Sequence, residues 1–305
     1  MDRLMKKLGL LALCTGLSLA VHAVTPQAEA PAEQNVKIDS VVVTGARYAS
    51  DIRHLPMTVS VVGREKIEQS LQPSLLPTLT EQVPGLFTTA RGIMGYGVSD
   101  GAAGGISLRG LSGGSGRLMV LIDGHPQYMG LMGHPIADAY QSLMAERVEV
   151  LRGPASVLYG SNAMGGVVNI VSKRVKDNAG EALVSVGSRG TANVAVSKNF
   201  AVSEALSFNL AADIYHTDGY QSTPSAYLWR FPNKRPVATE NRNVQLTTYI
   251  KPSADLSGFL RLGYHVQDQQ ISYEYGSNVQ RSPDLAASLT KTFDASSSLT
   301  TNLWA

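Results

Sequence analysis

The chain of 305 residues is about twice as long as a typical single domain, so its length favours two domains. Hydrophobic residues make up 44% of it and charged residues 16%, against a charged share of roughly 25% in soluble domains. This balance excludes a disordered protein and a typical basic nucleic-acid-binding protein. The single cysteine, Cys14, excludes an intramolecular disulfide framework and any cysteine-rich metal or redox site.

Residues 1–23 have the features of a secretory signal peptide. Basic side chains precede an apolar stretch at residues 8–20, and small residues precede the expected cleavage point after Ala23. A membrane anchor is the alternative, but the stretch is shorter than the ~20 residues that cross a bilayer. Without residues 1–23 the chain has 23 basic and 23 acidic side chains, so the basic balance of the whole chain does not indicate a nucleic-acid partner.

Two segments with different properties follow the signal. Residues 24–37 are rich in proline, alanine, glutamate and glutamine, and with almost no large apolar side chains they predict a flexible linker. Residues 38–45 contain a run of β-branched side chains. Such a run favours an extended strand, which can add to an open sheet edge.

Residues 46–177 mix short strands and short helices with glycine-rich turns, which is typical of an α+β domain. Their apolar and β-branched runs predict strands, and their capping and breaker residues delimit the helices. The expected strands are 58–62, 105–109, 117–123, 146–151 and 166–173, and the expected helices are 64–70 and 74–83.

From about residue 180 the pattern changes to alternation. In residues 205–216 and 256–266 the even-numbered positions are mostly apolar, and most odd-numbered positions are polar. Stretches of about ten residues with this alternation, separated by turns, are typical of an outer-membrane β-barrel. A soluble β-sandwich with outward polar side chains is the alternative, because its strands alternate in the same way.

Motifs for catalysis and cofactor binding are weak. Gly97–Gly101 and Gly110–Gly114 match the G-x-S-x-G pattern, but no helix is expected after either, and a serine nucleophile such as Ser112 needs one. A glycine-rich nucleotide loop fails for the same reason. The loop from His125 to His134 contains methionines and could present soft groups to iron or haem, although a solvated loop without metal is favoured. We expect no enzymatic activity and no cofactor.

Three segments resemble the plug domain of TonB-dependent outer-membrane receptors. They are residues 108–110 (Leu-Arg-Gly), 120–124 (Val-Leu-Ile-Asp-Gly) and the long run 146–172. Residues 38–45 similarly resemble the TonB box of these receptors. The resemblance points to the branch of siderophore, haem, cobalamin and colicin receptors. It implies a signal peptide at 1–23, a linker at 24–37, a TonB box at 38–45, a plug domain at 46–177 and barrel strands at 178–305.

The implied fold is an α+β plug domain followed by antiparallel transmembrane β-barrel strands, in the bacterial outer membrane. The implied function is import of a scarce ligand such as an iron-siderophore, haem or cobalamin. Its partners would be the TonB protein with its inner-membrane energising complex, outer-membrane lipid, and an iron-chelate, haem or corrinoid ligand. A plug-like binding module of the periplasm or outer membrane that does not transport is the alternative.

The resemblance also implies three sets of site residues. The expected TonB-binding residues are Asp39, Ser40, Val41, Val42, Val43, Thr44 and Gly45. Polar contacts between plug and barrel are expected at Arg109, Glu149 and Arg152, with ion pairing inside the plug as an equal alternative. Loops 90–105 and 124–139 would offer cationic, aromatic and soft groups to the ligand, namely Arg91, Tyr96, His125, Tyr128, Met129, Met132 and His134.

The length of the second part does not fit a complete transporter. A plug fills a wide barrel of about 22 strands, whereas the residues after 180 make roughly six to eight strands of about ten residues each. We therefore expect the N-terminal part of a receptor, with an incomplete barrel and an open sheet edge.

Overall fold

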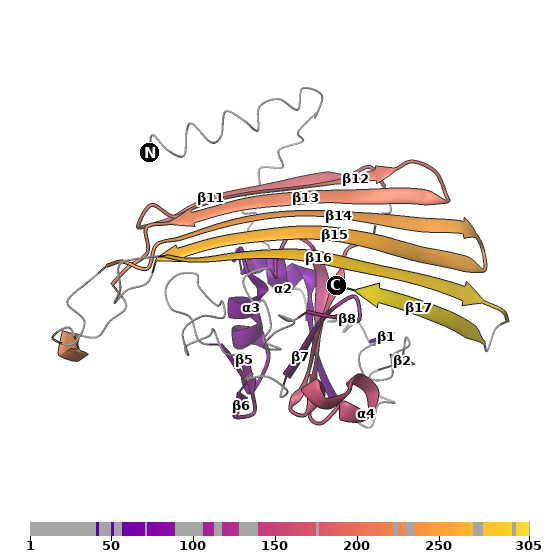
Figure 1. The fold of residues 1–305 in the computed structure, drawn as a ribbon, viewed down its shortest axis with the longest axis horizontal. Coiled ribbons are helices and arrows are strands. Elements are labelled where there is room, and N and C mark those ends of the chain that lie inside the picture. Colours follow the sequence, from indigo (N-terminus) through magenta and orange to yellow (C-terminus); the bar gives the residue numbers. More distant parts are fainter. Residues whose placement is uncertain are drawn as a thin grey trace, which may run out of the picture.

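The structure is a computed structural model. It describes residues 41–42, 50–51, 57–70, 72–88, 106–112, 118–127, 140–174, 177–221, 225–227, 229, 235–270, 277–294 and 297–304. The predicted signal peptide and linker lie outside the described residues. Two parts can be distinguished: an N-terminal body, residues 57–174, and a broad curved sheet, residues 180–304, which we call the wall (Figure 1).

The N-terminal body is built on a five-stranded sheet. Its strands, in spatial order, are β3 (Thr58–Gly63), β9 (Ala145–Arg152), β10 (Gly166–Ser172), β7 (Leu118–Ile122) and β8 (His125–Pro126). β10 and β7 run parallel, and the other pairs are antiparallel. The apolar run of β7 has no alternation because both faces of this strand are buried.

Short helices cover both faces of this sheet. α2 (Arg64–Gln69) and α3 (Leu75–Gln82) lie at the predicted helices, and the Ser74 side chain caps α3 by accepting a hydrogen bond from the Leu76 amide. Their apolar side chains pack on one face with Val148 and Val150. The other face buries Leu151 and Val167. The segment with α4 (Ser156–Tyr159) and η4 (Ser161–Ala163) covers that face, and β4 (Leu86–Thr88), β5 (Ile106–Leu108) and β6 (Leu111–Ser112) form a small separate sheet.

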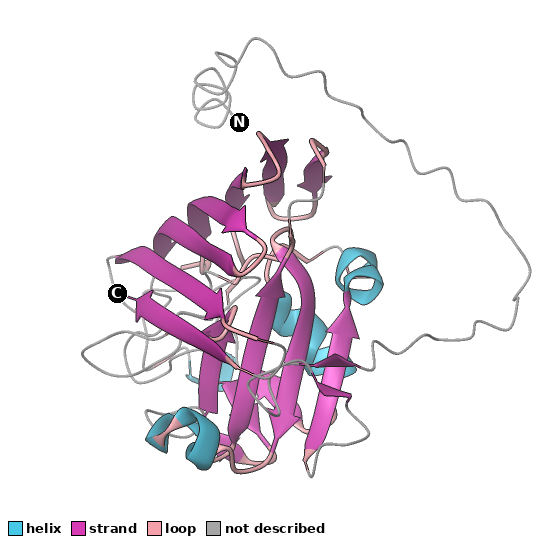
Figure 2. Cartoon of the chain, turned by 90° about the vertical axis from the view of Figure 1, so that its right-hand side faces the viewer, coloured by secondary structure: helices cyan, strands magenta, loops and turns pink. Residues whose placement is uncertain are grey.

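The wall contains seven antiparallel strands, and each pairs with its neighbours in sequence. This number lies within the expected six to eight, and the sheet is open along the described residues. The N-terminal body lies under it, with body strands running across the wall strands (Figures 1 and 2). The strands are β11 (Gly180–Val186), β12 (Ala192–Ala201), β13 (Leu206–Thr217), β14 (Thr239–Ser253), β15 (Leu256–Gln270), β16 (Ser277–Thr292) and β17 (Ser298–Trp304).

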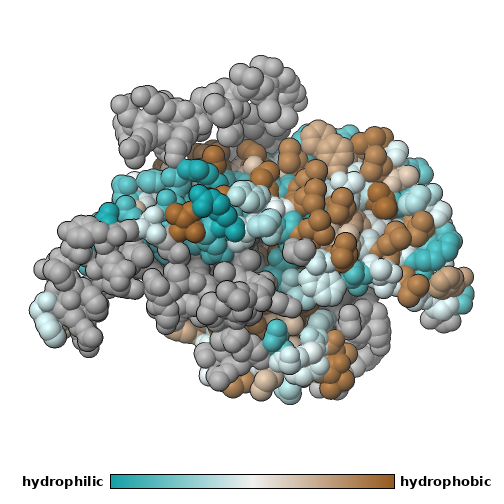
Figure 3. Space-filling model, in the orientation of Figure 1, coloured by the Kyte–Doolittle hydropathy of each residue, from teal (hydrophilic) through white to brown (hydrophobic). Residues whose placement is uncertain are grey.

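The two faces of the wall differ in polarity. The face turned away from the body carries exposed apolar side chains, and Figure 3 shows them in brown over the wall strands. The inner face buries polar side chains, including those of Asn209, Asn241 and Arg261. A soluble sandwich would bury its apolar face instead, so this arrangement favours the barrel interpretation over the sandwich. The exposed apolar residues include Val184, Leu210, Val244, Leu262, Leu289 and Leu303.

The two ends of the wall also differ. Short turns join β12 to β13, β14 to β15 and β16 to β17 at one end. The sequence between β13 and β14 is longer, and its η5 (Ser225–Tyr227) lies beyond the other end, at the left of Figure 1. Among the described residues, no helix is both long and apolar enough to cross a membrane.

Candidate functional site at the junction of body and wall

A sharp turn at residues 123–124 brings a carboxylate to the junction. Asp123 and Gly124 follow β7, and both have positive φ, at 50° and 82°. Gly124 suits this conformation because it has no Cβ, and aspartate is one of the few other residues that adopt it readily. The Gly124 amide donates to the Asn169 side chain at 3.1 Å. The turn is therefore held against the neighbouring strand β10.

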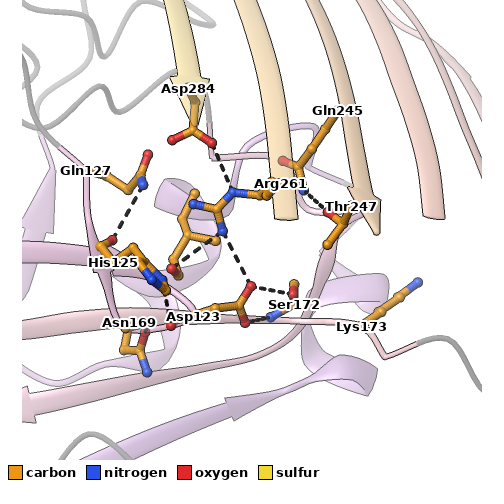
Figure 4. A network of polar contacts seen from close by, with 12 residues as sticks. Asp123, His125, Gln127, Asn169, Ser172, Lys173, Gln245, Thr247, Arg261 and Asp284 are labelled. Atoms are coloured by element: carbon orange, nitrogen blue, oxygen red, sulfur yellow. Dashed lines mark hydrogen bonds and ion pairs between the residues drawn. The ribbon is translucent and has the colours of Figure 1, made fainter. Parts of the chain in front are cut away.

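The Asp123 carboxylate accepts hydrogen bonds from β10 and faces the wall. One oxygen accepts from the Ser172 amide at 2.9 Å, and the other accepts from the Ser172 hydroxyl at 2.6 Å. The Asp123 amide donates to the Ile170 carbonyl at 2.8 Å. These contacts, all within the body, hold the carboxylate at the end of the parallel pair β7 and β10 (Figure 4).

Arg261 supplies the cation from the wall. It lies on the inner face of β15, and its side chain is 0% exposed. Its Nη1 lies 3.4 Å from Asp123 Oδ2, and its Nε donates to Asp284 Oδ2 of β16 at 2.9 Å. The guanidinium thus bridges a carboxylate of the body and a carboxylate of the wall (Figure 4). A buried charge needs such pairing, because burial without a partner is very costly. We call Asp123, Arg261 and Asp284 the latch.

A second contact lies beside the latch. The Tyr249 hydroxyl on β14 donates to the Lys173 carbonyl at 3.1 Å, and the Arg174 guanidinium lies 5.0 Å from the centre of the Tyr249 ring. Ser172 also approaches this hydroxyl at 3.4 Å. The end of β10 is therefore attached to β14 through the consecutive residues 172–174, in addition to the attachment of the latch to β15.

A third contact joins helix α2 to the first wall strand. Arg64 donates to the carbonyls of Ser142 and Ala145 at 2.8 and 3.0 Å, and its Nη2 lies 3.2 Å from Glu181. Glu181, near the start of β11, also pairs with Lys173. Burial lowers the pKa of Lys173 below its usual value, and the hydrogen bond to Glu181 opposes that shift. The body is thus tied to β11, β14 and β15 by polar contacts.

His125 is at this junction rather than on an open loop. It is 3% exposed, and its ring makes edge contacts with Phe259 at 5.3 Å and Trp304 at 6.1 Å between centroids. Its Nδ1 lies 3.1 Å from the Asp123 carbonyl. His125, predicted as a ligand contact, therefore has packing partners on the inner face of β15 and β17, and its role in ligand binding stays a prediction. The other predicted ligand contacts, Arg91, Tyr96, Tyr128, Met129, Met132 and His134, lie outside the described residues and remain predictions.

The three residues predicted to join plug and barrel have different surroundings. Glu149 is fully buried and accepts from Arg147 at 2.9 Å, which is the ion pair inside the body that we considered as the alternative. Arg109 is exposed, with φ 53° and its amide bonded to the Gly85 carbonyl. Arg152 is half-buried. Their expected role at the junction of plug and barrel stays a prediction.

Of the predicted box, the structure describes Val41 and Val42. They form β1 (Val41–Val42), which pairs antiparallel with β2 (Ser50–Asp51) in a separate two-stranded sheet. Val41 lies opposite Asp51. The β-branched pair is thus extended, as predicted, and one of its two edges is paired within the chain.

Sequence reasoning missed the latch, although two signals pointed to it. Asp123 belongs to the motif at residues 120–124, and Arg261 is a lone cation among the inward positions of a strand with strict alternation. Nothing local showed that these two residues meet. In the described parts of the chain, no group of three or more histidine, cysteine, aspartate or glutamate side chains could hold a metal ion.

A buried ion pair joins the α+β body to the polar face of a sheet whose other face is apolar and exposed. This arrangement is that of a plug against the wall of a barrel. Residues 51–167 match the family model for the TonB-dependent Receptor Plug Domain. The chain therefore carries a plug domain of the TonB-dependent receptor type, followed by a barrel-type antiparallel sheet. From here we call the N-terminal body the plug.

Known proteins resemble this chain over both parts. The "Iron-regulated outer membrane virulence protein" of Vibrio cholerae is 34% identical over 200 residues, which cover 62% of this chain and 29% of that protein. The chain thus spans about a third of the length of this relative. The alcaligin outer-membrane receptor of Bordetella pertussis has a TM-score of 0.66 at 18% identity, covering 86% of this chain and 41% of that one. A mutant ferric enterobactin receptor of Pseudomonas aeruginosa has a TM-score of 0.60 at 19% identity, covering 81% and 40%.

Proposed function

We propose that this protein is a TonB-dependent receptor that imports an iron chelate across the bacterial outer membrane. The observation that carries this proposal is the position of the plug. A buried ion pair between Asp123 and Arg261 fixes it against the polar inner face of a sheet whose outer face is apolar. The name of the iron-regulated relative and the siderophore receptors of similar fold support an iron chelate as cargo.

The wall gives the proposed membrane orientation. Barrels of the bacterial outer membrane have short turns on the periplasmic side and longer loops outside. The end that carries the connection between β13 and β14 would therefore face the medium, and the end with the turn between β14 and β15 would face the periplasm. The ligand would enter at the first end.

Energy would come from the periplasmic side, because the outer membrane holds no nucleotide. Residues 38–45 would be the TonB box, and their strand would add to a sheet of the TonB protein through main-chain hydrogen bonds. Within the part of the chain that the structure describes, β1 pairs with β2 alone, so its other edge suits such an addition. A pull on this strand would reach the plug at Thr58, where β3 begins.

Replacing Val42 by proline tests this function. Proline removes one backbone donor from the added strand, so energised uptake of a radiolabelled ferric siderophore should fall roughly tenfold or more. Binding of the same chelate to de-energised cells should stay within about twofold, because the external surface is unchanged. Val42→Thr keeps the donor and the β-branched shape, so it serves as the matched control. Normal uptake by the proline variant would refute the box.

The outer face of the wall gives a separate test of membrane insertion. Leu262 is 44% exposed and lies in the middle of β15. Leu262→Arg should destabilise the protein in lipid vesicles by about 2–4 kcal/mol, because a cation there meets hydrocarbon. Asp268→Arg, outward on the same strand but near its end, should cost at most about 1 kcal/mol. Equilibrium unfolding by urea measures both, and equal effects would contradict a membrane-facing surface.

A further inference from the structure

We propose that Thr239, Asn241 and His265 form a binding site on the inner wall for an electrically neutral iron chelate that carries amide, hydroxamate or hydroxyl groups. We call these three residues the inner-wall patch. This inference rests on the proposed import function and names the chemical class of its substrate. It concerns a different part of the wall from the latch.

Strand register brings the patch together. Thr239 and Asn241 are alternate residues of β14 and therefore share its inner face. Asn241 lies directly opposite Gln267 of β15, and Asn243 lies opposite His265, so His265 is a diagonal neighbour of Asn241. Diagonal neighbours on one face lie about 7–8 Å apart, whereas Thr239 lies four residues, about 13 Å along the strand, from the position opposite His265. A chelate that contacts all three side chains must therefore span the row, with Asn241 at its centre.

The patch has buried hydrogen-bonding atoms without protein partners. Thr239, Asn241 and His265 are 2%, 1% and 4% exposed. Among the described residues, no partner exists for Thr239 Oγ1, for either polar atom of the Asn241 amide, or for His265 Nε2. Buried polar groups without a partner are costly, so such clusters normally serve water or a ligand. Asn193 on β12 lies opposite Tyr215, which in turn lies opposite Asn241, and its Oδ1 is also buried without a partner among the described residues.

Neighbouring side chains fix the chemistry of His265. The Asn243 amide nitrogen donates to both oxygens of Asp213, at 3.0 and 2.9 Å. Asn243 therefore turns its carbonyl oxygen to His265 Nδ1, which must be the protonated nitrogen of that contact. His265 Nε2 is then left with a lone pair, and it accepts a hydrogen bond from a ligand N–H or O–H. The Asn241 amide adds one donor group and one acceptor.

The charges around the patch select a neutral ligand. The patch itself has no charged side chain, and the nearest charged group in the inner-face register is the Asp213 carboxylate, opposite Asn243. The buried cation of this face, Arg261, is already bound by Asp123 and Asp284. Anionic chelates are recognised by free arginine or lysine side chains. The patch offers an anion no cation, whereas neutral amides, hydroxamates and hydroxyls match every open donor and acceptor.

The location of the patch relates it to transport. Asn241 is near the end of β14 that follows the long connection, and Thr247, opposite Arg261, lies six residues further along. Six residues of strand span about 20 Å, so the patch is closer to the proposed outer side than the latch. Tyr215, opposite Asn241, packs into the apolar core of the plug. The plug therefore covers this row at rest, and a ligand reaches the patch when the plug shifts.

The test compares energised uptake with binding in the protein expressed from its own gene, in cells without other chelate receptors. The probes are a neutral ferric trihydroxamate and an anionic ferric tricatecholate, both radiolabelled. The variant Thr239→Val/Asn241→Leu should lower the uptake rate of the trihydroxamate roughly tenfold, because its open hydrogen bonds are lost. Binding to de-energised cells should stay within about twofold, which also shows that the variant has folded. Thr248→Leu, on the outer face of β14, is the matched control and should transport normally.

A second measurement is independent of uptake rates. Cys14 is the single cysteine and lies in the predicted signal peptide, so Asn241→Cys gives one labelling position. A thiol reagent should label it faster during trihydroxamate uptake than at rest. The proposed binding site is wrong if the double variant takes up the trihydroxamate at the normal rate, or if the labelling rate is the same with and without transport. If the unaltered protein imports only the tricatecholate, the proposal that the ligand is electrically neutral is wrong. Import of neither probe by the unaltered protein overturns the proposed function, and the patch with it.

Discussion

Replacing Arg261 by leucine is expected to destabilise the folded protein by about 3–5 kcal/mol, the usual cost of breaking a buried ion pair from one side. The substitution leaves Asp123 and Asp284 without their shared cation, and Asp123 is 7% exposed. Thermal unfolding in detergent measures the loss. Limited proteolysis should also cleave the plug faster, because Arg261 is its direct ionic link to β15.

Two further variants separate the latch from general damage to the wall. Arg281→Leu removes an exposed arginine from β16 and should change stability by less than about 0.5 kcal/mol. Adding Asp123→Asn to Arg261→Leu should recover part of the loss, since it removes one of the uncompensated charges. If Arg261→Leu were as stable as Arg281→Leu, the latch would not hold the plug.

Gly166→Ala is the second substitution with a large expected effect. Gly166 begins β10 with φ 151°, and a Cβ there would lie 2.4 Å from the Leu151 carbonyl oxygen and 2.6 Å from Leu108 Cδ2. The oxygen belongs to the paired strand β9 and cannot move without breaking the ladder. Backbone strain and overpacking each cost about 1–3 kcal/mol, so we expect a loss of about 3–5 kcal/mol.

Gly63→Ala is the matched control in the same sheet. A Cβ at Gly63 meets nothing within 4 Å, and its φ is −79°. The substitution should therefore change stability by less than about 1 kcal/mol, because alanine reduces the entropy of the unfolded chain but is a poorer N-cap for α2 than glycine. Equal losses at both glycines in a chemical denaturation series would show that close packing at Gly166 is not what requires glycine.

The surface between plug and wall has two regions: one with direct polar contacts, and one in which polar atoms of the wall lack a partner. The latch, Tyr249 and Arg64 attach one end of the plug sheet to the wall. Around Asn241, buried polar atoms of the wall find no partner in the described plug. We expect plug movement to open the second region first, because fewer direct interactions must break there.

Local chemistry alone predicted much of the fold. Helices α2 and α3 and the strands of both parts lie close to their expected positions, because caps, β-branched runs and glycine turns act within a few residues. The motif at residues 120–124 and the long run 146–172 indicated the plug before any contact was known. Arg261 followed the alternation as one of the polar odd-numbered positions of its strand.

Only the tertiary structure decided which way the alternation faces and which charges meet. Odd and even positions alternate in polarity in a sandwich as well as in a barrel, so the pattern alone does not show which face is buried. In this protein the plug packs against the polar face, which is therefore the inner one. Arg261 and Asp123 are 138 residues apart, and Arg64 and Glu181 are 117 apart. No local preference encodes such pairs, because they depend on how the plug sheet crosses the wall.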